Sequence, residues 1–148
     1  MMKKLAVLAV ILFGLSVGAL KSGVFTPEAP QVSSSTAAGD AQLARAYEEK
    51  RSSVQVQAAG TVKKVLQDDN DGSRHQRFIL ELSTGQTLLV AHNIDLAPRV
   101  EDLRRGDRLE FSGEYEWSQQ GGVIHWTHRD PKERHIDGWI RHKGKFYW

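Results

Sequence analysis

Histidines and carboxylates are the residues of this chain best suited to bind a metal ion. The 148 residues include six histidines and no cysteine, so imidazole and carboxylate groups are the available ligands for zinc, copper, nickel or iron. The predicted metal set, for a divalent transition metal such as zinc, is His92, Asp95, His125 and His128. His125 and His128 share a site only if their strand ends before Asp130-Pro131, because residues three apart in a strand face opposite ways. The alternative, which spacing favours, is a set of histidines that form only surface or structural hydrogen bonds.

A second group of polar residues is suited to bind an anionic ligand. His75 and Arg77 lie on one face of a predicted strand that follows the Asp/Gly-rich turn 68–72. The guanidinium group of arginine presents a fork of donors that matches phosphate or carboxylate. The predicted ligand-binding residues, with two tryptophans as stacking surfaces, are His75, Arg77, His92, Glu114, Trp126 and Trp139. The alternative is a solvated charged face that pairs with Glu110, Glu114 and Glu116 across strands.

Aromatic and basic residues are mixed through the C-terminal tail. From Arg129 to Lys145 the tail holds six Lys or Arg residues and three acidic ones, together with Trp139. Such surfaces stack bases or sugars, so single-stranded nucleic acid is one conceivable partner. The whole chain does not favour it, because loss of Lys3 and Lys4 with a signal peptide brings its 20 basic residues down to the 18 acidic ones. A neutral domain lacks the electrostatic attraction that nucleic-acid binding needs.

Several kinds of site are excluded by the sequence. The absence of cysteine removes thiol nucleophiles and cysteine-based zinc or iron–sulfur centres. Ser73 near His75 is not part of a Gly-x-Ser-x-Gly elbow, and the chain has no glycine-rich phosphate loop. The turn 68–72 fails as an EF-hand-like calcium loop, because Gln67 and Phe78 stand where its end ligands are required.

The N-terminus has the pattern of a secretion signal. Lys3 and Lys4 precede a small and apolar run up to Leu20, in which Ala19 suits cleavage. We predict a signal peptide at 1–19, a flexible Ser/Pro/Ala-rich tether at 20–39, and a monomeric domain at 40–148. The expected location is the bacterial periplasm. An uncleaved signal is the alternative, and it would give the only contact with a membrane, although a span needs about 20 residues.

The remaining sequence predicts a mainly β domain. Asp40 is a predicted N-cap for a short helix that ends near Arg51. A second short helix is expected to begin at Asp95, and a hairpin that turns at Lys143-Gly144 is expected at 137–148. Alternating apolar residues, with a bulge near Lys63-Lys64, predict strands near 54–66, 75–82, 86–92, 109–117 and 123–127. Three strands, a helix and two more strands is the order of a small five-stranded OB-like barrel.

Five segments of this domain together resemble one protein family. They are DNDGSRHQRFIL (69–80), GQTLLVAHNIDLAPR (85–99), GDRLEFSGEYEW (106–117), GGVIHWTHRDP (121–131) and HIDGWI (135–140). They resemble a family of exported bacterial proteins known as domain-of-unknown-function family 3465. The likeness covers roughly residues 55–148 and implies an exported OB-like domain. It implies no reaction, no ligand and no site residues.

Three functions are compatible with these features. The first is a non-enzymatic exported module that binds an unidentified ligand, such as an anionic small molecule or polymer. The second is a metal-dependent hydrolase of phosphodiesters, in which the histidine and aspartate set holds the ion and Arg77 stabilises developing negative charge. The third is an envelope interaction protein that uses its C-terminal hairpin. The lack of a complete catalytic signature favours the first and leaves enzymatic activity undecided.

Overall fold

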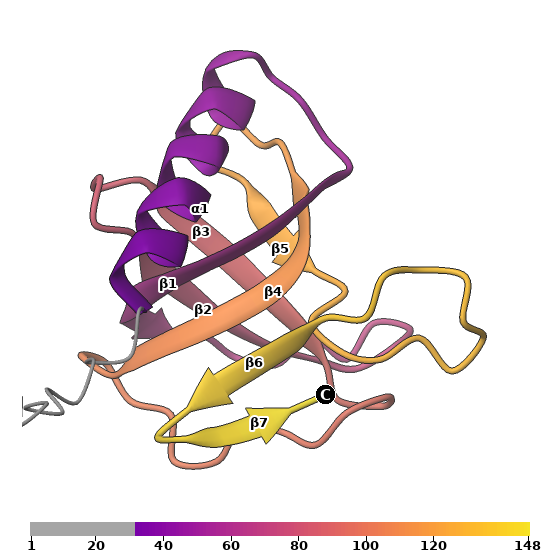
Figure 1. Ribbon diagram of the computed structural model, residues 1–148. Helices are drawn as coiled ribbons and strands as arrows, with labels where there is room; N and C mark the ends of the chain where they lie inside the picture. Colours follow the sequence, from indigo (N-terminus) through magenta and orange to yellow (C-terminus); the bar gives the residue numbers. More distant parts are fainter. Residues whose placement is uncertain (1–31) are drawn as a thin grey trace, which may run out of the picture.

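The protein is a β-barrel with one helix packed beside it and a hairpin that extends from it (Figure 1). The computed structural model describes residues 32–148, so the predicted signal peptide and the first part of the predicted tether lie outside the described residues. Its elements are α1 (Val32–Glu48), β1 (Val54–Val65), β2 (His75–Glu81), β3 (Thr87–Asn93), β4 (Arg108–Glu116), β5 (Val123–His125), β6 (Trp139–His142) and β7 (Lys145–Tyr147). No helix in the described part of the chain is long and apolar enough to cross a membrane.

Five strands close into the barrel that the sequence predicts. They pair in the order β1-β2-β3-β5-β4, and β4 returns to pair with β1. β3 and β5 run parallel, whereas the other neighbours in the barrel are antiparallel. β1 reaches both β2 and β4 because its register shifts between Val62 and Lys64, at the predicted bulge. This closure confirms a mainly β, OB-like fold.

Alternating side chains fill the barrel. Every second residue of β2 and β3 is buried, which directs Phe78, Leu80 and Val90 inward. The same alternation in β4 buries Phe111 and Tyr115 completely. The outward positions of β4 therefore carry polar side chains, namely Glu110, Ser112, Glu114 and Glu116.

The helix α1 packs on β1, where Leu43 and Ala46 are fully buried in the core. It begins at Val32, within the segment expected to be irregular, and Asp40 lies inside it rather than at its N-cap. The Asp40 carboxylate accepts a hydrogen bond from the hydroxyl of Ser83 instead. A Cβ atom at Gly39 would lie 2.0 Å from the carbonyl oxygen of Gln57, so this glycine lets the helix approach β1. Tertiary packing, rather than the weak helical pattern of 32–39, sets where this helix starts.

The connection between β3 and β4 contains turns and no helix, so the second predicted helix is wrong. One helix-like hydrogen bond forms, from the amide of Ala97 to the carbonyl of Asn93, and Pro98 has no amide hydrogen to continue the series. Val100 is nevertheless buried, and the side chain of Gln76 holds its backbone amide and carbonyl. Side-chain bonds to the barrel thus replace helical ones.

The predicted C-terminal hairpin is present as β6 and β7. Lys143 and Gly144 both have positive φ, as a two-residue hairpin turn requires. β6 pairs with residues 109–112 of β4, whereas β5 pairs with residues 114–116 of the same strand. Gly113 lies between the two segments, and a Cβ atom there would meet the carbonyl oxygen of His125 at 2.6 Å. The partner of β4 on this edge therefore changes from β6 to β5 at Gly113, and we call this position the fork of β4. The loop 126–138 leaves the barrel there.

Candidate metal site on the outer face of β4 and β5

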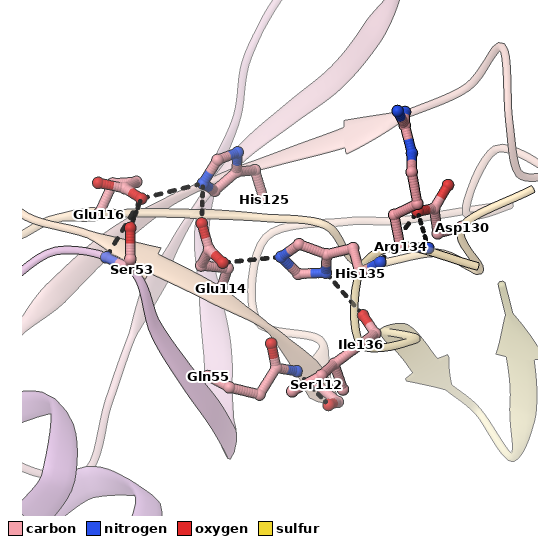
Figure 2. A network of polar contacts seen from close by, with 10 residues as sticks. All are labelled: Ser53, Gln55, Ser112, Glu114, Glu116, His125, Asp130, Arg134, His135 and Ile136. Carbon is pink, nitrogen blue, oxygen red and sulfur yellow. Dashed lines mark hydrogen bonds and ion pairs between the residues drawn. The ribbon is translucent and has the colours of Figure 1, made fainter. Parts of the chain in front are cut away.

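The fork of β4 brings two carboxylates and two histidines together on the outer face of the barrel (Figure 2). Glu114 and Glu116 are two residues apart on one strand, so both side chains face outward. His125 of β5 lies directly opposite Glu114 in the strand register. The loop 126–138 supplies the second histidine, His135, from the other side of Glu114.

The Nε2 atom of His125 points at two carboxylates without a hydrogen bond to either. It lies 3.6 Å from Oε1 of Glu114 and 3.7 Å from Oε1 of Glu116, both longer than a hydrogen bond. The same nitrogen is shielded from solvent and has no hydrogen-bond partner. A buried ring nitrogen without a partner costs free energy, so the arrangement favours a cation between the three groups.

His135 is hydrogen-bonded through both ring nitrogens next to Glu114. Its Nε2 donates to Oε2 of Glu114 at 2.7 Å and its Nδ1 donates to the carbonyl of Ile136 at 2.8 Å. Both ring nitrogens face acceptors, which is the arrangement of an imidazolium ion. Burial lowers the pKa of His135, but the bonds to Glu114 and Ile136 raise it by more, so this pKa lies above its ordinary value. One oxygen of Glu114 is thereby fixed and the other faces His125.

The loop 126–138 is built to hold His135 in place. The indole of Trp126 stacks on the His135 ring with centroids 4.1 Å apart and planes 7° apart. Asp130 accepts hydrogen bonds from the backbone amides of Lys132, Arg134 and His135, at 2.9, 2.8 and 3.0 Å. These amides lower the pKa of Asp130 below its ordinary value. Trp126 itself has a φ of 55°, a strained conformation for a bulky residue that the surrounding loop maintains.

Glu116 is anchored at the edge of β1. Its Oε1 accepts hydrogen bonds from the backbone amide and the hydroxyl of Ser53, at 3.2 and 3.3 Å. Burial raises the pKa of Glu116, but hydrogen bonds with the side chains of Ser52 and Glu114 and with Ser53 bring it below its ordinary value. Glu116 is therefore an ionised carboxylate at neutral pH, as a metal ligand must be.

A second unpartnered buried atom lies on the strand next to Glu114. Gln55 of β1 is the register partner of Glu114, and its Oε1 is buried without a hydrogen-bond partner. Its amide nitrogen donates to the hydroxyl of Ser112 at 3.3 Å (Figure 2). Nε2 of His125 on β5 and Oε1 of Gln55 on β1, the two strands that pair with β4 on either side, are thus both buried without a hydrogen-bond partner.

His92, which belongs to both predicted sets, lies inside the barrel and not in this site. Its Nε2 donates to the carbonyl of Pro98 at 3.0 Å, and its Nδ1 accepts from the hydroxyl of Thr127 at 2.8 Å. Burial, the largest effect, lowers the pKa of His92 to about 4, so the ring is neutral. Both ring nitrogens are used by the protein itself.

The structure does not bring the predicted metal set together. Asp95 binds the Nε atom of Arg74 at 2.7 Å, and hydrogen bonds from Arg74 lower the pKa of Asp95. The Nδ1 of His128 donates to the carbonyl of Arg129 at 2.7 Å. Within residues 32–148, only Glu114, Glu116 and His125 place three metal-ligand atoms within 4.8 Å of one another. His125 is thus the one member of the predicted set in the observed group, and metal binding itself stays a prediction.

The structure also places only some of the predicted ligand-binding residues in this site. Glu114 and Trp126 belong to the site. His75 and Arg77 lie on the outward face of β2, separated from β5 by β3, and bind the carbonyls of Ser73 at 2.8 Å and Gln67 at 3.1 Å. Trp139 lies on β6 opposite Ser112, beside the site rather than in it. Their role in ligand binding stays a prediction.

Glu116 and His135 are the site residues that the sequence analysis did not select. The alternation of β4 already places Glu116 on the same face as Glu114, and this pattern would have identified it. His135 was not identifiable, because only the turns of loop 126–138 return it to Glu114.

Together these features define a small OB-like barrel domain with a carboxylate and imidazole cluster on its outer face. The chain belongs to the family described as protein of unknown function (DUF3465), whose model matches residues 28–148. No curated protein matches the chain at a significant level.

Proposed function

We propose that the chain is an exported binding module whose ligand is a divalent transition-metal ion, held by His125, Glu114 and Glu116. The observation that carries this proposal is the unpartnered Nε2 of His125, buried between two carboxylate oxygens. A neutral imidazole and two carboxylates balance the charge of a divalent ion. An anionic ligand, by contrast, would be repelled by Glu114 and Glu116.

The spacing of the three ligand atoms supports this ion type. Atoms bound tetrahedrally at about 2.0–2.1 Å from zinc lie about 3.3 Å apart. The two nitrogen–oxygen separations, 3.6 and 3.7 Å, are close to this value, and the two carboxylate oxygens lie within 4.8 Å of each other. The hydrogen bond from His135 to the second oxygen of Glu114 orients this carboxylate, as outer-shell partners of metal ligands do. A nitrogen and two oxygens suit zinc, nickel or copper better than calcium or magnesium.

Metal titration of the untagged, chelator-free chain tests the proposal. We expect one equivalent of zinc by elemental analysis after dialysis and a saturable heat of binding by calorimetry. His125→Ala is expected to weaken binding by more than about a hundredfold, since even the loss of outer-shell partners costs up to this factor. The matched control is His75→Ala, which removes a histidine from the outward face of β2 and leaves the cluster intact.

Two results would contradict the proposal. One is the absence of binding for zinc, copper, nickel and manganese alike, which would make the cluster a charge network with a protonated His125. The other is binding that His125→Ala leaves unchanged while His75→Ala removes it, which would place the ion on β2.

Hydrolysis is a second candidate function, and the number of protein ligands favours it. Three ligands leave at least one coordination position for water, the feature that distinguishes catalytic from structural zinc sites. Zinc-dependent cleavage of bis-p-nitrophenyl phosphate, lost in His125→Ala, would support a hydrolase. Metal binding without such cleavage would leave the binding module as the function.

A further inference from the structure

A hollow lies between the loop 126–138 and the C-terminal hairpin, and the proposed metal ligands do not line it. Its volume is about 500 Å³, within the range of about 300–1,000 Å³ that is usual for small-molecule sites. Trp139 and Trp148 contribute its aromatic surface. Arg129, Glu133 and Asp137 contribute polar groups.

The aromatic side chains at this hollow are unusually exposed. Trp148 is 44% and Phe146 is 42% exposed, and Ile136 in the adjoining loop is 64% exposed. Phe146 stacks on Trp148 with centroids 5.1 Å apart and meets Trp139 edge-on at 5.3 Å. Through these contacts the aromatic rings of the hairpin form one continuous surface. A contiguous exposed apolar patch with a polar rim marks a binding surface.

The polar groups of the hollow have free hydrogen-bonding capacity. The Arg129 guanidinium lies over the Trp148 ring at 4.2 Å, and among residues 32–148 it has no hydrogen-bond or ion-pair partner. The Glu133 carboxylate is exposed and equally without a partner in this part of the chain. Asp137 uses one oxygen to accept from the amide of Asp130. The hollow thus offers both donors and acceptors to a ligand.

The charge of the hollow disfavours polyanions. Its lining includes one arginine against three carboxylates, those of Asp130, Glu133 and Asp137. Three basic residues of the tail are neutralised by acids of other segments, in the pairs Arg141–Glu110, Lys143–Asp107 and Lys145–Glu101. The lining of the hollow therefore has no excess of positive charge that would attract a nucleic acid or an anionic lipid surface.

We propose that this hollow binds a pyranose unit of an oligosaccharide. A pyranose ring offers an apolar C–H face to an indole, and its hydroxyl groups donate to carboxylates and accept from a guanidinium. It carries no charge that the carboxylates would repel. Aromatic walls at Trp139 and Trp148 together with Arg129, Glu133 and Asp137 match these three properties. The proposal does not depend on metal binding at His125.

Titration with two neutral sugars, chitotetraose and cellotetraose, tests this assignment. Tryptophan fluorescence and calorimetry on the full chain report binding, in buffer with chelator and again with zinc. We expect saturable binding of at least one sugar in both buffers and a loss of roughly tenfold in affinity for Trp148→Ala, since one stacked ring contributes on this scale. Glu133→Gln, an exposed change that leaves the fold intact, is expected to weaken binding severalfold. The matched control is Leu96→Ala, which removes a side chain that is 47% exposed outside the hollow.

Four outcomes would overturn the assignment. The first is no binding of either sugar at millimolar concentration. The second is sugar binding that Trp148→Ala and Glu133→Gln leave unchanged. The third is capture of oligothymidylate or of phosphatidylglycerol vesicles in preference to both sugars. Loss of sugar binding in His125→Ala, with the hollow unaltered, would show that the ligand occupies the metal site instead.

Discussion

His92 and His125 are both strand residues, and the difference between them lies in what reaches their ring nitrogens. His92 points into the barrel, where Pro98 and Thr127 satisfy Nε2 and Nδ1. His125 points outward, and its Nε2 is shielded from solvent but meets only two carboxylates at distances beyond a hydrogen bond. The more deeply buried histidine is therefore the one with no capacity left for a ligand.

This comparison separates two uses of polar residues in one barrel. The hydrogen bonds of His92 link β3 to the connection after it and to Thr127, so this histidine serves the fold. The carboxylates next to His125 are held in place by Ser53 and His135, so their Oε1 atoms stay directed at a ring nitrogen that has no hydrogen bond. Predictions that separate stability from binding test the distinction.

The largest expected effect on stability is that of His92→Ala. It leaves a cavity in the core and removes the partners of the buried Thr127 hydroxyl and the partly buried Pro98 carbonyl, so we expect a loss of about 3–5 kcal/mol. Chemical denaturation measures this loss, and zinc affinity in the remaining folded protein should be unchanged. His125→Ala should show the reverse, with a stability change of about 1 kcal/mol or less. Equal losses of stability in the two variants would remove the distinction.

The next largest effect is a pH dependence that originates at His92. The pKa of this histidine is about 4 in the folded protein against 6.5 as its ordinary value, so between these values the unfolded chain binds the extra proton. The contribution of His92 to stability is therefore fully present above pH 6.5 and is lost as the pH is lowered towards 4, by about 3 kcal/mol in total. His135, with a raised pKa, has the opposite slope.

A comparison of the wild type with His92→Gln isolates this contribution. Glutamine can donate to Pro98 and accept from Thr127 without titrating, so the variant should lose less stability on acidification than the wild type. Urea denaturation at a series of pH values measures both curves. Parallel curves would show that His92 does not govern the acid limb.

Periodicity was sufficient to predict the strands, because most inward residues of β2, β3 and β4 are apolar, with Gln76 and His92 as the polar exceptions, and the outward ones are at least partly exposed. The bulge at Lys63-Lys64 interrupts this alternation and was predictable for the same reason. The start of α1 was not predictable, since the Ser/Thr/Ala stretch before Gly39 has no helical pattern of its own. The first part of α1 is helical because of contacts with β1, and a local sequence pattern carries no information about those contacts.

The site was only partly predictable, because it depends on register. Glu114 and His125 were both selected, but their pairing requires knowledge of how β5 aligns with β4. His92 was selected on residue type alone, and an inward position of the same strand made it a core residue. A histidine at an outward strand position beside two carboxylates is the pattern that would have separated the two cases.

A smaller effect is expected for His135→Gln, which alters the partner of Glu114 and no proposed ligand. Glutamine can still donate to Oε2 of Glu114 but loses the positive charge and much of the stacking on Trp126. We expect zinc affinity to decrease by roughly tenfold, or about 1.4 kcal/mol, which is the scale for the loss of an outer-shell partner. Calorimetry measures it, with His75→Ala as the control. An effect as large as that of His125→Ala would make His135 a ligand in its own right.

The smallest effect is expected for Asp130→Asn. This substitution tests whether the ordered structure of loop 126–138 affects zinc affinity as well as stability. The amide group keeps one acceptor oxygen, so either the bond from Lys132 or those from Arg134 and His135 are lost. We expect about 1 kcal/mol less stability and a decrease in zinc affinity of no more than about threefold, because Trp126 still stacks on His135. Denaturation and calorimetry on the same sample measure the two quantities. A decrease beyond that of His135→Gln would mean that loop order, and not the His135 side chain, positions Glu114.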